Sequence, residues 1–200
     1  MQDKLSRICL FCASSPGIDD IYFKEAKILA HELAAHNIAI NYGGGAKGLM
    51  GLVSEILLQK DKKLVRGFIP DFMRKMGWSH QAVDDMVVVR DMHERKYLMR
   101  KDVDAIIALP GGVGTLEELM EVITLKQLGQ FTKPIVILNT RNFYTPLHKI
   151  LNKMAKEHFM RDIHTTIWQI VNDPKEVIPA IINAPAWDAE ALKFAAVEKH

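Results

Sequence analysis

The sequence predicts a single-domain, Rossmann-like α/β fold in which helices cover both faces of a doubly wound, mainly parallel sheet. Short apolar runs of strand length alternate with segments of helical periodicity along the whole chain, and the sequence contains no internal repeat. Two of the apolar runs end in glycine-rich turns that lead directly into a helix. Because open α/β sheets bind ligands at the carboxyl ends of their strands, we expect both turns to border one cleft.

The composition is that of an ordinary globular protein. Its 200 residues are 48% hydrophobic and 25% charged, which suits one domain over residues 1–185 with a sizeable core. The formal charge of +2, from 26 basic and 24 acidic residues, gives no general attraction for nucleic acid or membrane. The N-terminus lacks a signal peptide's apolar core and no apolar run reaches membrane-spanning length, so we expect a cytoplasmic protein. Residues 186–200 are Ala- and charge-rich, a composition compatible with a mobile tail.

Periodicity places the individual elements. Apolar runs predict strands at residues 7–13, 38–42, 63–69, 86–90, 103–109, 134–139 and 166–171. Helical spacing predicts helices at residues 21–36, 49–59, 92–101, 116–128, 143–159 and 175–182, with residues 71–80 irregular or partly helical. Asp91 and Asp173 are the expected N-caps of two helices, and Pro174 suits the first helical position after Asp173.

The stretch LPGGVGTLEELME at residues 109–121 is the most informative part of the chain. Its proline and three glycines allow a sharp turn and a close approach of a ligand to the backbone. Thr115 is the expected N-cap of the next helix, and Glu118 completes the pattern of a capping box; the plainer alternative is that Glu118 only caps. The N–H groups and positive dipole end of such a helix favour a phosphate. The residues expected to contact it are Gly111, Gly112, Val113, Gly114 and Thr115.

Two further turns are expected at the same edge of the sheet. Ser14 follows the first strand and is expected either to touch a phosphate or sugar or to serve turn geometry alone. GGGAKGLMG at residues 43–51 follows the second strand, so Gly44 and Gly45 are expected to line the cleft; the alternative is a tight turn with close helix packing. This segment lacks the end of a Walker A loop and the strict order of a dinucleotide fingerprint, so it does not indicate ATP or NAD.

Cys9 and Cys12 form a Cys-x-x-Cys pattern on the first strand and its exit. Such a pattern can serve redox or metal chemistry, but the sequence has no second pair to complete a zinc site. We therefore expect two buried, reduced thiols, and neither a metal nor an organic cofactor.

The sequence contains DMHERK at residues 91–96, followed by PGGVGTLEEL at residues 110–119. These two motifs in this order resemble the Lonely Guy (LOG) family of phosphoribohydrolases, whose members have often been labelled lysine decarboxylases. The resemblance runs from the first strand to about residue 159 and includes GGGAKGLMG and EVITLKQLGQFTKPIVILN. It implies hydrolysis of the N-glycosidic bond of a nucleoside 5′-monophosphate, giving a free base and ribose 5-phosphate. The typical substrates are N6-substituted (cytokinin) adenosine monophosphates, and many members accept AMP.

The resemblance also implies the residues of the site. The family's catalytic pair corresponds to Arg95 and Glu118, and Lys96, Glu117 and Thr124 complete the set expected to contact the substrate. Members are dimers or higher assemblies with the site near the subunit interface. Many relatives place a glutamate before the arginine motif, where this chain has Met76 and Gly77. Recognition of the base or the ribose is therefore expected to be altered. Asp84, Asp85 or a residue of a partner chain is expected to substitute for that glutamate.

The chemistry of the residues agrees with that reaction. Breaking a ribosyl C–N bond develops oxocarbenium character, which the carboxylate of Glu118 can stabilise while it positions or deprotonates the attacking water. Arg95 offers a fork of donors to the phosphate, the ribose or Glu118. Without the family context, an exposed i, i+4 pair between Arg95 and Asp91 would be the simpler interpretation.

Two other functions compete with hydrolysis. The same fold hosts proteins that carry a nucleotide or cofactor without cleaving it, although a carrier has no need of the Arg95–Glu118 pair. A pyridoxal-phosphate lysine decarboxylase would need a reactive lysine, and Lys47, Lys96 and Lys101 lie in no recognisable setting for that cofactor.

Overall fold

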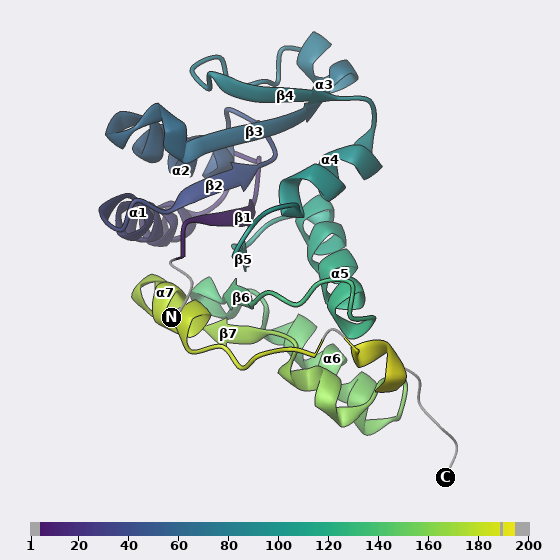
Figure 1. The fold of residues 1–200 in the computed structure, drawn as a ribbon. Coiled ribbons are helices and arrows are strands. Elements are labelled where there is room, and N and C mark those ends of the chain that lie inside the picture. Colours follow the sequence, from purple (N-terminus) through teal and green to yellow (C-terminus); the bar gives the residue numbers. More distant parts are fainter. Residues whose placement is uncertain (1–4, 189, 195–200) are drawn as a thin grey trace.

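The computed structural model describes residues 5–188 and 190–194 (Figure 1). Its strands are β1 (Arg7–Phe11), β2 (Ala39–Tyr42), β3 (Val65–Pro70), β4 (Asp85–Val89), β5 (Ala105–Ala108), β6 (Ile135–Leu138) and β7 (Gln169–Val171). They form one seven-stranded sheet in the order β4-β3-β2-β1-β5-β6-β7. Each neighbouring pair is parallel, so the predicted doubly wound sheet is confirmed.

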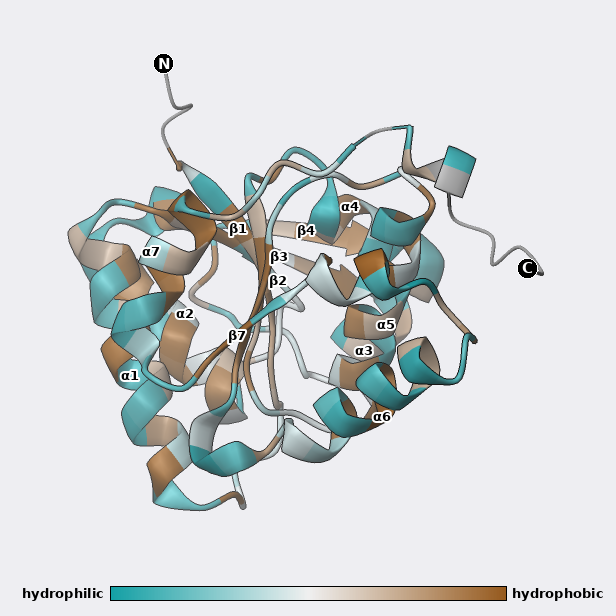
Figure 2. Ribbon diagram, turned by 90° about the horizontal axis from the view of Figure 1, so that it is seen from below, coloured by the Kyte–Doolittle hydropathy of each residue, from teal (hydrophilic) through white to brown (hydrophobic). Residues whose placement is uncertain are grey.

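The main helices cover the two faces of this sheet (Figure 2). They are α1 (Asp20–Ala35), α2 (Gly48–Lys60), α3 (Asp71–Lys75), α4 (Met92–Arg100), α5 (Val113–Gln127), α6 (Thr145–Lys156) and α7 (Val177–Ile182). Helices α1, α2 and α7 pack on one face, and α4, α5 and α6 pack on the other, each layer enclosing its own apolar core. The three-layer architecture follows from strands that are largely apolar on both faces.

The sheet changes winding direction between β1 and β5. From β1 the chain proceeds outward through β2, β3 and β4, and then returns to place β5 on the other side of β1. The turns after these two central strands diverge at such a switch point, which is where open α/β sheets bind ligands. Hydrogen bonds tie the turns together, because Ala13 N donates to Pro110 O (3.1 Å) and Leu49 N donates to Ala13 O (2.9 Å).

Helix caps explain several element boundaries. Asp91 caps α4 as expected, since its carboxylate accepts from Glu94 N at 2.9 Å. Asp173 also caps, accepting from Lys175 N at 2.8 Å, but the segment it starts is the short 3₁₀ helix Pro174–Glu176, and α7 begins only at Val177. Helix α1 ends at Ala35, where Asn37 takes a left-handed conformation with φ of 54°.

Other expected boundaries were too generous. Strand β1 ends at Phe11 instead of residue 13, because the backbone of Ala13 bonds to the two neighbouring turns and not to the sheet. Residues 162–166 form a 3₁₀ helix, so the last strand is limited to Gln169–Val171. The helix expected at residues 143–159 spans Thr145–Lys156 and begins with its proline in the first turn.

Both cysteines are buried and free, as expected. Cys9 belongs to the core on the α4–α6 face, and Cys12 belongs to the core on the α1–α2 face. Burial raises the pKa of both thiols, which keeps them protonated and unreactive.

Part of the expected C-terminal tail packs on the domain. Trp187 Nε1 donates to the carbonyl of Lys126 in α5 at 2.6 Å, and Ala191 is fully buried. Residues 189 and 195–200 of that tail lie outside the described residues. Within residues 5–188 and 190–194, every helix falls short of the length and apolarity that a membrane span requires.

Candidate active site

Arg95 is buried beneath the carboxyl ends of β2 and β3. The residue is 6% exposed, its Nε donates to Phe68 O at 3.0 Å, and its Nη2 donates to Gly43 O at 3.0 Å. The third nitrogen, Nη1, lies 3.5 Å from Glu118 Oε1. The exposed pairing of Arg95 with Asp91 is therefore not formed, and Asp91 caps the helix instead.

Gly43 makes this placement of Arg95 possible, and sequence analysis missed it. A Cβ atom at Gly43 would lie 2.0 Å from Arg95 Nη2, a distance that no side chain can adopt without displacing the guanidinium. The neighbouring Gly44 and Gly45 were expected to line the cleft, whereas the steric requirement falls on the glycine before them. The signal in the sequence was the run of three glycines, which does not identify which one approaches another chain segment.

Glu118 faces Arg95 from the first turns of α5 and is 4% exposed. Burial raises the pKa of its carboxyl group to about 7, against the opposing effect of the Arg95 charge. The negative charges of Glu117 and Glu121 also raise it, whereas Lys96 lowers it. A carboxyl group with this pKa takes up and releases protons near neutral pH.

The expected capping box of α5 is wrong. The helix begins at Val113 with Gly112 as its N-cap, so Thr115 lies inside the first turn and Glu118 lies one turn further on. Thr115 is buried and packs over Gly111, where a Cβ atom would lie 2.1 Å from Thr115 Oγ1. Because Gly112 has no side chain, the first N–H groups of the helix receive no side-chain cap.

The N-terminus of α5 is thus open to an anion. Gly112, Val113 and Gly114 are exposed, and a Cβ atom at either glycine would meet nothing within 4 Å. Tyr144, at the start of α6, supports the turn from below, because its buried hydroxyl donates to Leu109 O at 2.7 Å. Sequence analysis gave no role to Tyr144, because its contact joins residues 35 positions apart.

The other two turns border the same edge. Ser14 is exposed at the exit of β1, and a Cβ atom at Gly48 would lie 2.6 Å from the carbonyl carbon of Ser14, so the two turns touch. Gly44 is buried with φ of 74°, its carbonyl accepts from His80 N at 2.9 Å, and Gly45 is partly buried beside it. The turns after β1, β2 and β5 therefore lie at one edge of the sheet, as expected.

Lys96 and Glu117 bind each other in a second ionic cluster between α4 and α5. The Lys96 ammonium donates to Glu117 and lies 3.4 Å from Glu121 Oε2, which also lies 3.5 Å from Arg100 Nη1. Burial acts to lower the pKa of Lys96, but the hydrogen bond to Glu117 and the charge of Glu121 outweigh it and raise the pKa. This cluster fixes the two helices that carry Arg95 and Glu118.

Thr124 lies away from the other expected substrate contacts. It is exposed, and its hydroxyl donates to Met120 O at 2.9 Å within α5. It is nine residues beyond Thr115, which places it roughly 13 Å further along the helix axis. The structure therefore does not bring Thr124 to the turn that begins α5.

The segment that lacks the family's usual glutamate follows α3. Met76 is exposed, and Gly77 has φ of 75° with open space around it. Asp84 and Asp85 lie at the opposite end of β4 from the site, where Asp84 pairs with Lys62 (3.0 Å) and Asp85 with Arg66 (2.6 Å). Neither aspartate is placed to substitute for that glutamate.

No group of three or more metal-ligating side chains gathers anywhere in the part of the chain that the structure describes. The lysines considered for pyridoxal phosphate do not gather either. Lys96 is occupied by Glu117 and Glu121, and Lys47 and Lys101 are exposed on different segments.

Solved structures of similar fold include two molybdenum cofactor proteins. The carrier protein of Chlamydomonas reinhardtii superposes with a TM-score of 0.64 at 16% identity, covering 88% of this chain and 95% of that one. The molybdenum cofactor binding protein of Rippkaea orientalis gives a TM-score of 0.61 at 19% identity, covering 88% and 94%. At these identities the likeness extends to the fold alone.

Sequence comparison gives nearer relatives. A family model described as "Possible lysine decarboxylase" matches residues 50–181. The chain is 38% identical over 204 residues to a probable cytokinin riboside 5′-monophosphate phosphoribohydrolase of Oryza sativa subsp. japonica, covering 97% of this chain and 83% of the relative. It is 43% identical over 161 residues to a cytokinin riboside 5′-monophosphate phosphoribohydrolase of Arabidopsis thaliana, covering 80% and 75%. With the family model, these relatives and both expected motifs in agreement, the chain belongs to the Lonely Guy (LOG) family.

Proposed function

We propose that this protein hydrolyses the N-glycosidic bond of a purine nucleoside 5′-monophosphate, with N6-substituted adenine (cytokinin) or adenine as the base, to give the free base and ribose 5-phosphate. The observation that carries the proposal is the buried pair of Arg95 and Glu118, 3.5 Å apart, beside the open N-terminus of α5. The relatives named for this activity support it.

The 5′-phosphate binds at the turn that begins α5. The first N–H groups of the helix and its positive dipole end are available there, and exposed glycines leave room for close approach. The residues in this role are Gly111, Gly112, Val113, Gly114 and Thr115, with Ser14, Gly44 and Gly45 across the edge. Because Glu118 lies about one and a half helical turns from this end, a bound phosphate brings the ribose close to its carboxylate.

Glu118 performs two tasks in the reaction. Its carboxylate stabilises the positive charge that develops on the ribose as the C1′–N9 bond lengthens. It also accepts a proton from the water that attacks C1′, so that the hydroxyl joins C1′. The base departs with the electron pair of the C1′–N9 bond and takes up a proton from solvent. Arg95, held by two backbone carbonyls, fixes the carboxylate and maintains its ionised fraction.

The proposal includes a homodimer or higher homo-oligomer in the cytoplasm, with the site near the subunit interface. Large apolar side chains are exposed around the site: Val113 is 84% exposed, Trp78 56% and Tyr97 53%. A partner subunit covering this surface can supply the acidic group absent at Met76 and Gly77. Light scattering coupled to size-exclusion chromatography tests this point, and a protein that stays monomeric while hydrolysing substrate contradicts it.

The decisive experiment measures release of free base from AMP and isopentenyl-AMP by chromatography. We expect Glu118→Gln and Arg95→Ala to lower the rate by about 100-fold or more, since each removes a preorganised charge. Arg90→Ala, which removes an exposed arginine from the same segment, is the matched control and should retain activity. A folded wild-type protein that binds nucleotide and releases no base overturns the proposal and favours a carrier.

A further inference from the structure

Polar side chains occupy a sheet face where apolar ones are expected. Strands of a buried parallel sheet are usually apolar on both faces. Here Arg7 on β1, Asn41 on β2 and Arg66 on β3 all lie on the α4 face. Asn41 pairs in register with Cys9 and with Arg66, so these three share a face. Arg7 is two residues before Cys9 and therefore points to the same face. The proposed hydrolysis uses none of these three residues.

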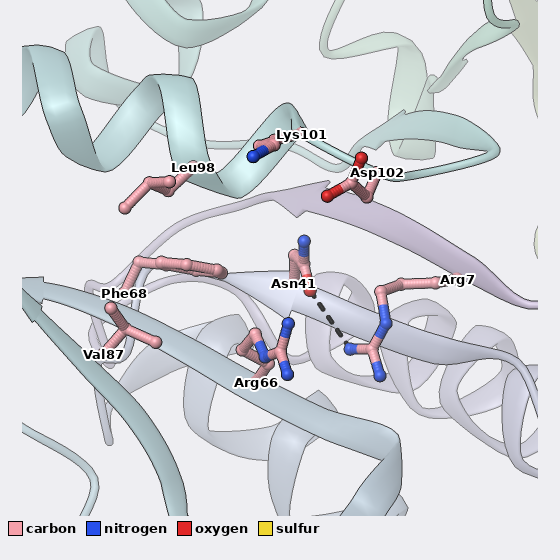
Figure 3. A pocket seen from close by; sticks show the side chains of 8 residues that line it. All are labelled: Arg7, Asn41, Arg66, Phe68, Val87, Leu98, Lys101 and Asp102. Carbon is pink, nitrogen blue, oxygen red and sulfur yellow. Dashed lines mark hydrogen bonds between the residues drawn. The ribbon is translucent and has the colours of Figure 1, made fainter.

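These side chains line a half-open cavity of about 300 Å³ (Figure 3). In the close-up, side chains from the strands form one side, and the end of α4 with the following turn forms the other. The apolar part of the wall comes from Phe68, Val87 and Leu98, and Lys101 and Asp102 complete the lining. Three of the lining residues are cationic and one is anionic, so the lining carries an excess of positive charge.

The polar floor of the cavity is held in place. Arg7 Nη1 donates to Asn41 Oδ1 at 3.1 Å, and Asn41 Nδ2 donates to Met99 O at 3.0 Å in α4. Asn41 is buried, and both its side-chain oxygen and its side-chain nitrogen have protein partners. The other guanidinium nitrogens of Arg7 have no hydrogen-bond partner among the residues the structure describes.

Two guanidinium groups therefore face the cavity without full compensation. Burial, followed by the positive charge of Arg66, lowers the pKa of Arg7, and the charges of Asp85 and Asp104 oppose this effect. Arg66 pairs with Asp85 at its exposed side. An anion between the two arginines would relieve their repulsion and use the free donors of Arg7.

We propose that this cavity is a second binding site, for a small organic anion. A carboxylate or phosphate group of the ligand binds between Arg7 and Arg66, and Lys101 adds a third cation at the rim. The apolar body of the ligand rests against the wall formed by Phe68, Val87 and Leu98.

The second site is separate from the candidate active site, although the two share one residue. The carbonyl of Phe68 accepts from Arg95, whereas its ring lines the cavity. Lys101 caps the C-terminal end of α4, six residues beyond Arg95, which corresponds to roughly 9 Å along the helix. Binding in the cavity does not depend on the proposed hydrolysis.

Isothermal titration calorimetry with two simple anions tests the proposal. Phenyl phosphate and benzoate are the probes, and benzyl alcohol is the neutral control. We expect at least one anion to bind and the alcohol not to bind, and the stronger anion identifies the preferred oxyanion. Arg66→Gln and Lys101→Gln should each weaken binding by about tenfold, the effect of one lost charge-assisted hydrogen bond, whereas Arg90→Gln should not. Both test residues are exposed, so neither change disturbs the core.

A pair of filling variants locates the ligand. Val87→Phe places bulk in the cavity and should abolish binding, whereas Val88→Phe, on the other face of β4, should leave it unchanged. Because the turn before α5 is also expected to bind phosphate, Thr115→Val serves as a further control. Three results would overturn the proposal. They are loss of binding in Thr115→Val but not in the cavity variants, binding of benzyl alcohol as strong as that of the anions, and no binding of either anion.

Discussion

At the scale of single residues, two opposing effects set the state of Glu118. Burial favours its neutral form and Arg95 favours its ionised form, and burial dominates. The resulting pKa of about 7 leaves a substantial ionised fraction at neutral pH while keeping the group basic enough to accept a proton from water. The Arg95 guanidinium is essential to this balance, because without it the carboxyl group would be more fully protonated.

The pH dependence of hydrolysis follows from this pKa. If Glu118 acts as the base, kcat/KM should fall about tenfold for each unit of pH below 7, as the carboxylate becomes protonated. Initial rates of base release measured between pH 5 and pH 9 provide the profile. A rate that stays flat from pH 7 to pH 5 would exclude Glu118 as the base.

The same pKa predicts a pH-dependent cost in stability. The folded pKa of about 7 lies above the ordinary value of 4.5, so the native state binds the extra proton, and the free energy of unfolding falls as pH rises from 4.5 to 7. The loss is about 3 kcal/mol by pH 8. Glu118→Gln lacks this titration, so the stability of the variant relative to wild type should be about 3 kcal/mol higher at pH 8 than at pH 4.

Urea denaturation of both proteins at the two pH values measures that difference. Glu157→Gln is the matched control, since its carboxylate is exposed at the end of α6 and does not contribute to the pKa of Glu118. An equal stability difference at both pH values would show that Glu118 titrates normally.

Gly43 offers a steric test of the Arg95 position. Gly43→Ala places a Cβ atom 2.0 Å from Arg95 Nη2, so the guanidinium must move away from Glu118 and base release should fall by about 100-fold. Gly17→Ala, where a Cβ atom meets nothing within 4 Å, should leave activity unchanged. Full activity of Gly43→Ala would show that Arg95 tolerates another position.

Sequence analysis identified Arg95 and Glu118 through the family motifs, but it could not identify what holds them. Gly43 and Arg95 are 52 positions apart, and their contact leaves no local pattern. The capping pattern of Thr115 and Glu118 was present in the sequence and wrong in the structure, because the burial of Glu118 against Arg95 outweighed the local preference.

At the scale of elements, the site depends on the relative placement of α4 and α5. The two helices contribute Arg95 and Glu118 respectively, and the neighbouring cluster of Lys96, Glu117 and Glu121 joins them across the same interface. The sequence predicted each helix, since periodicity and the Asp91 cap are local signals. It did not predict the ionic cluster, which requires knowledge of which helix faces meet.

A double-mutant cycle measures this connection. Lys96→Met and Glu117→Gln, alone and together, should give a coupling free energy of about 0.5–1 kcal/mol, because Lys96 is buried although Glu117 is half exposed. The exposed i, i+4 pair of Lys153 and Glu157 on α6 is the reference and should show weaker coupling. Equal coupling in the two cycles would mean that the α4–α5 pair contributes no more than a surface ion pair.

At the scale of the whole molecule, the alternation of strands and helices was sufficient to predict the fold class. The order of the strands and the position of the switch point beside β1 come from packing between distant segments. The C-terminal boundary was the least predictable feature, because composition alone suggested that the domain ends at residue 185. In the structure Trp187 packs against the core on the α4–α6 face and donates to α5, and Ala191 is buried.

Truncation tests where the domain ends. A chain ending at Pro185 should still fold, since the seven strands and the helices on both faces lie before it. It loses the Trp187 hydrogen bond to Lys126 O and the burial of Ala191, so we expect about 2 kcal/mol less stability and a Tm lower by roughly 4–8 °C. A chain ending at residue 194 keeps both contacts and is the control for shortening as such. If the two chains melt at the same temperature, the Trp187 contact contributes nothing to stability and the domain ends at residue 185. If the shorter chain fails to fold, the segment after residue 185 is an integral part of the domain, because without it the apolar surface of α5 is left uncovered.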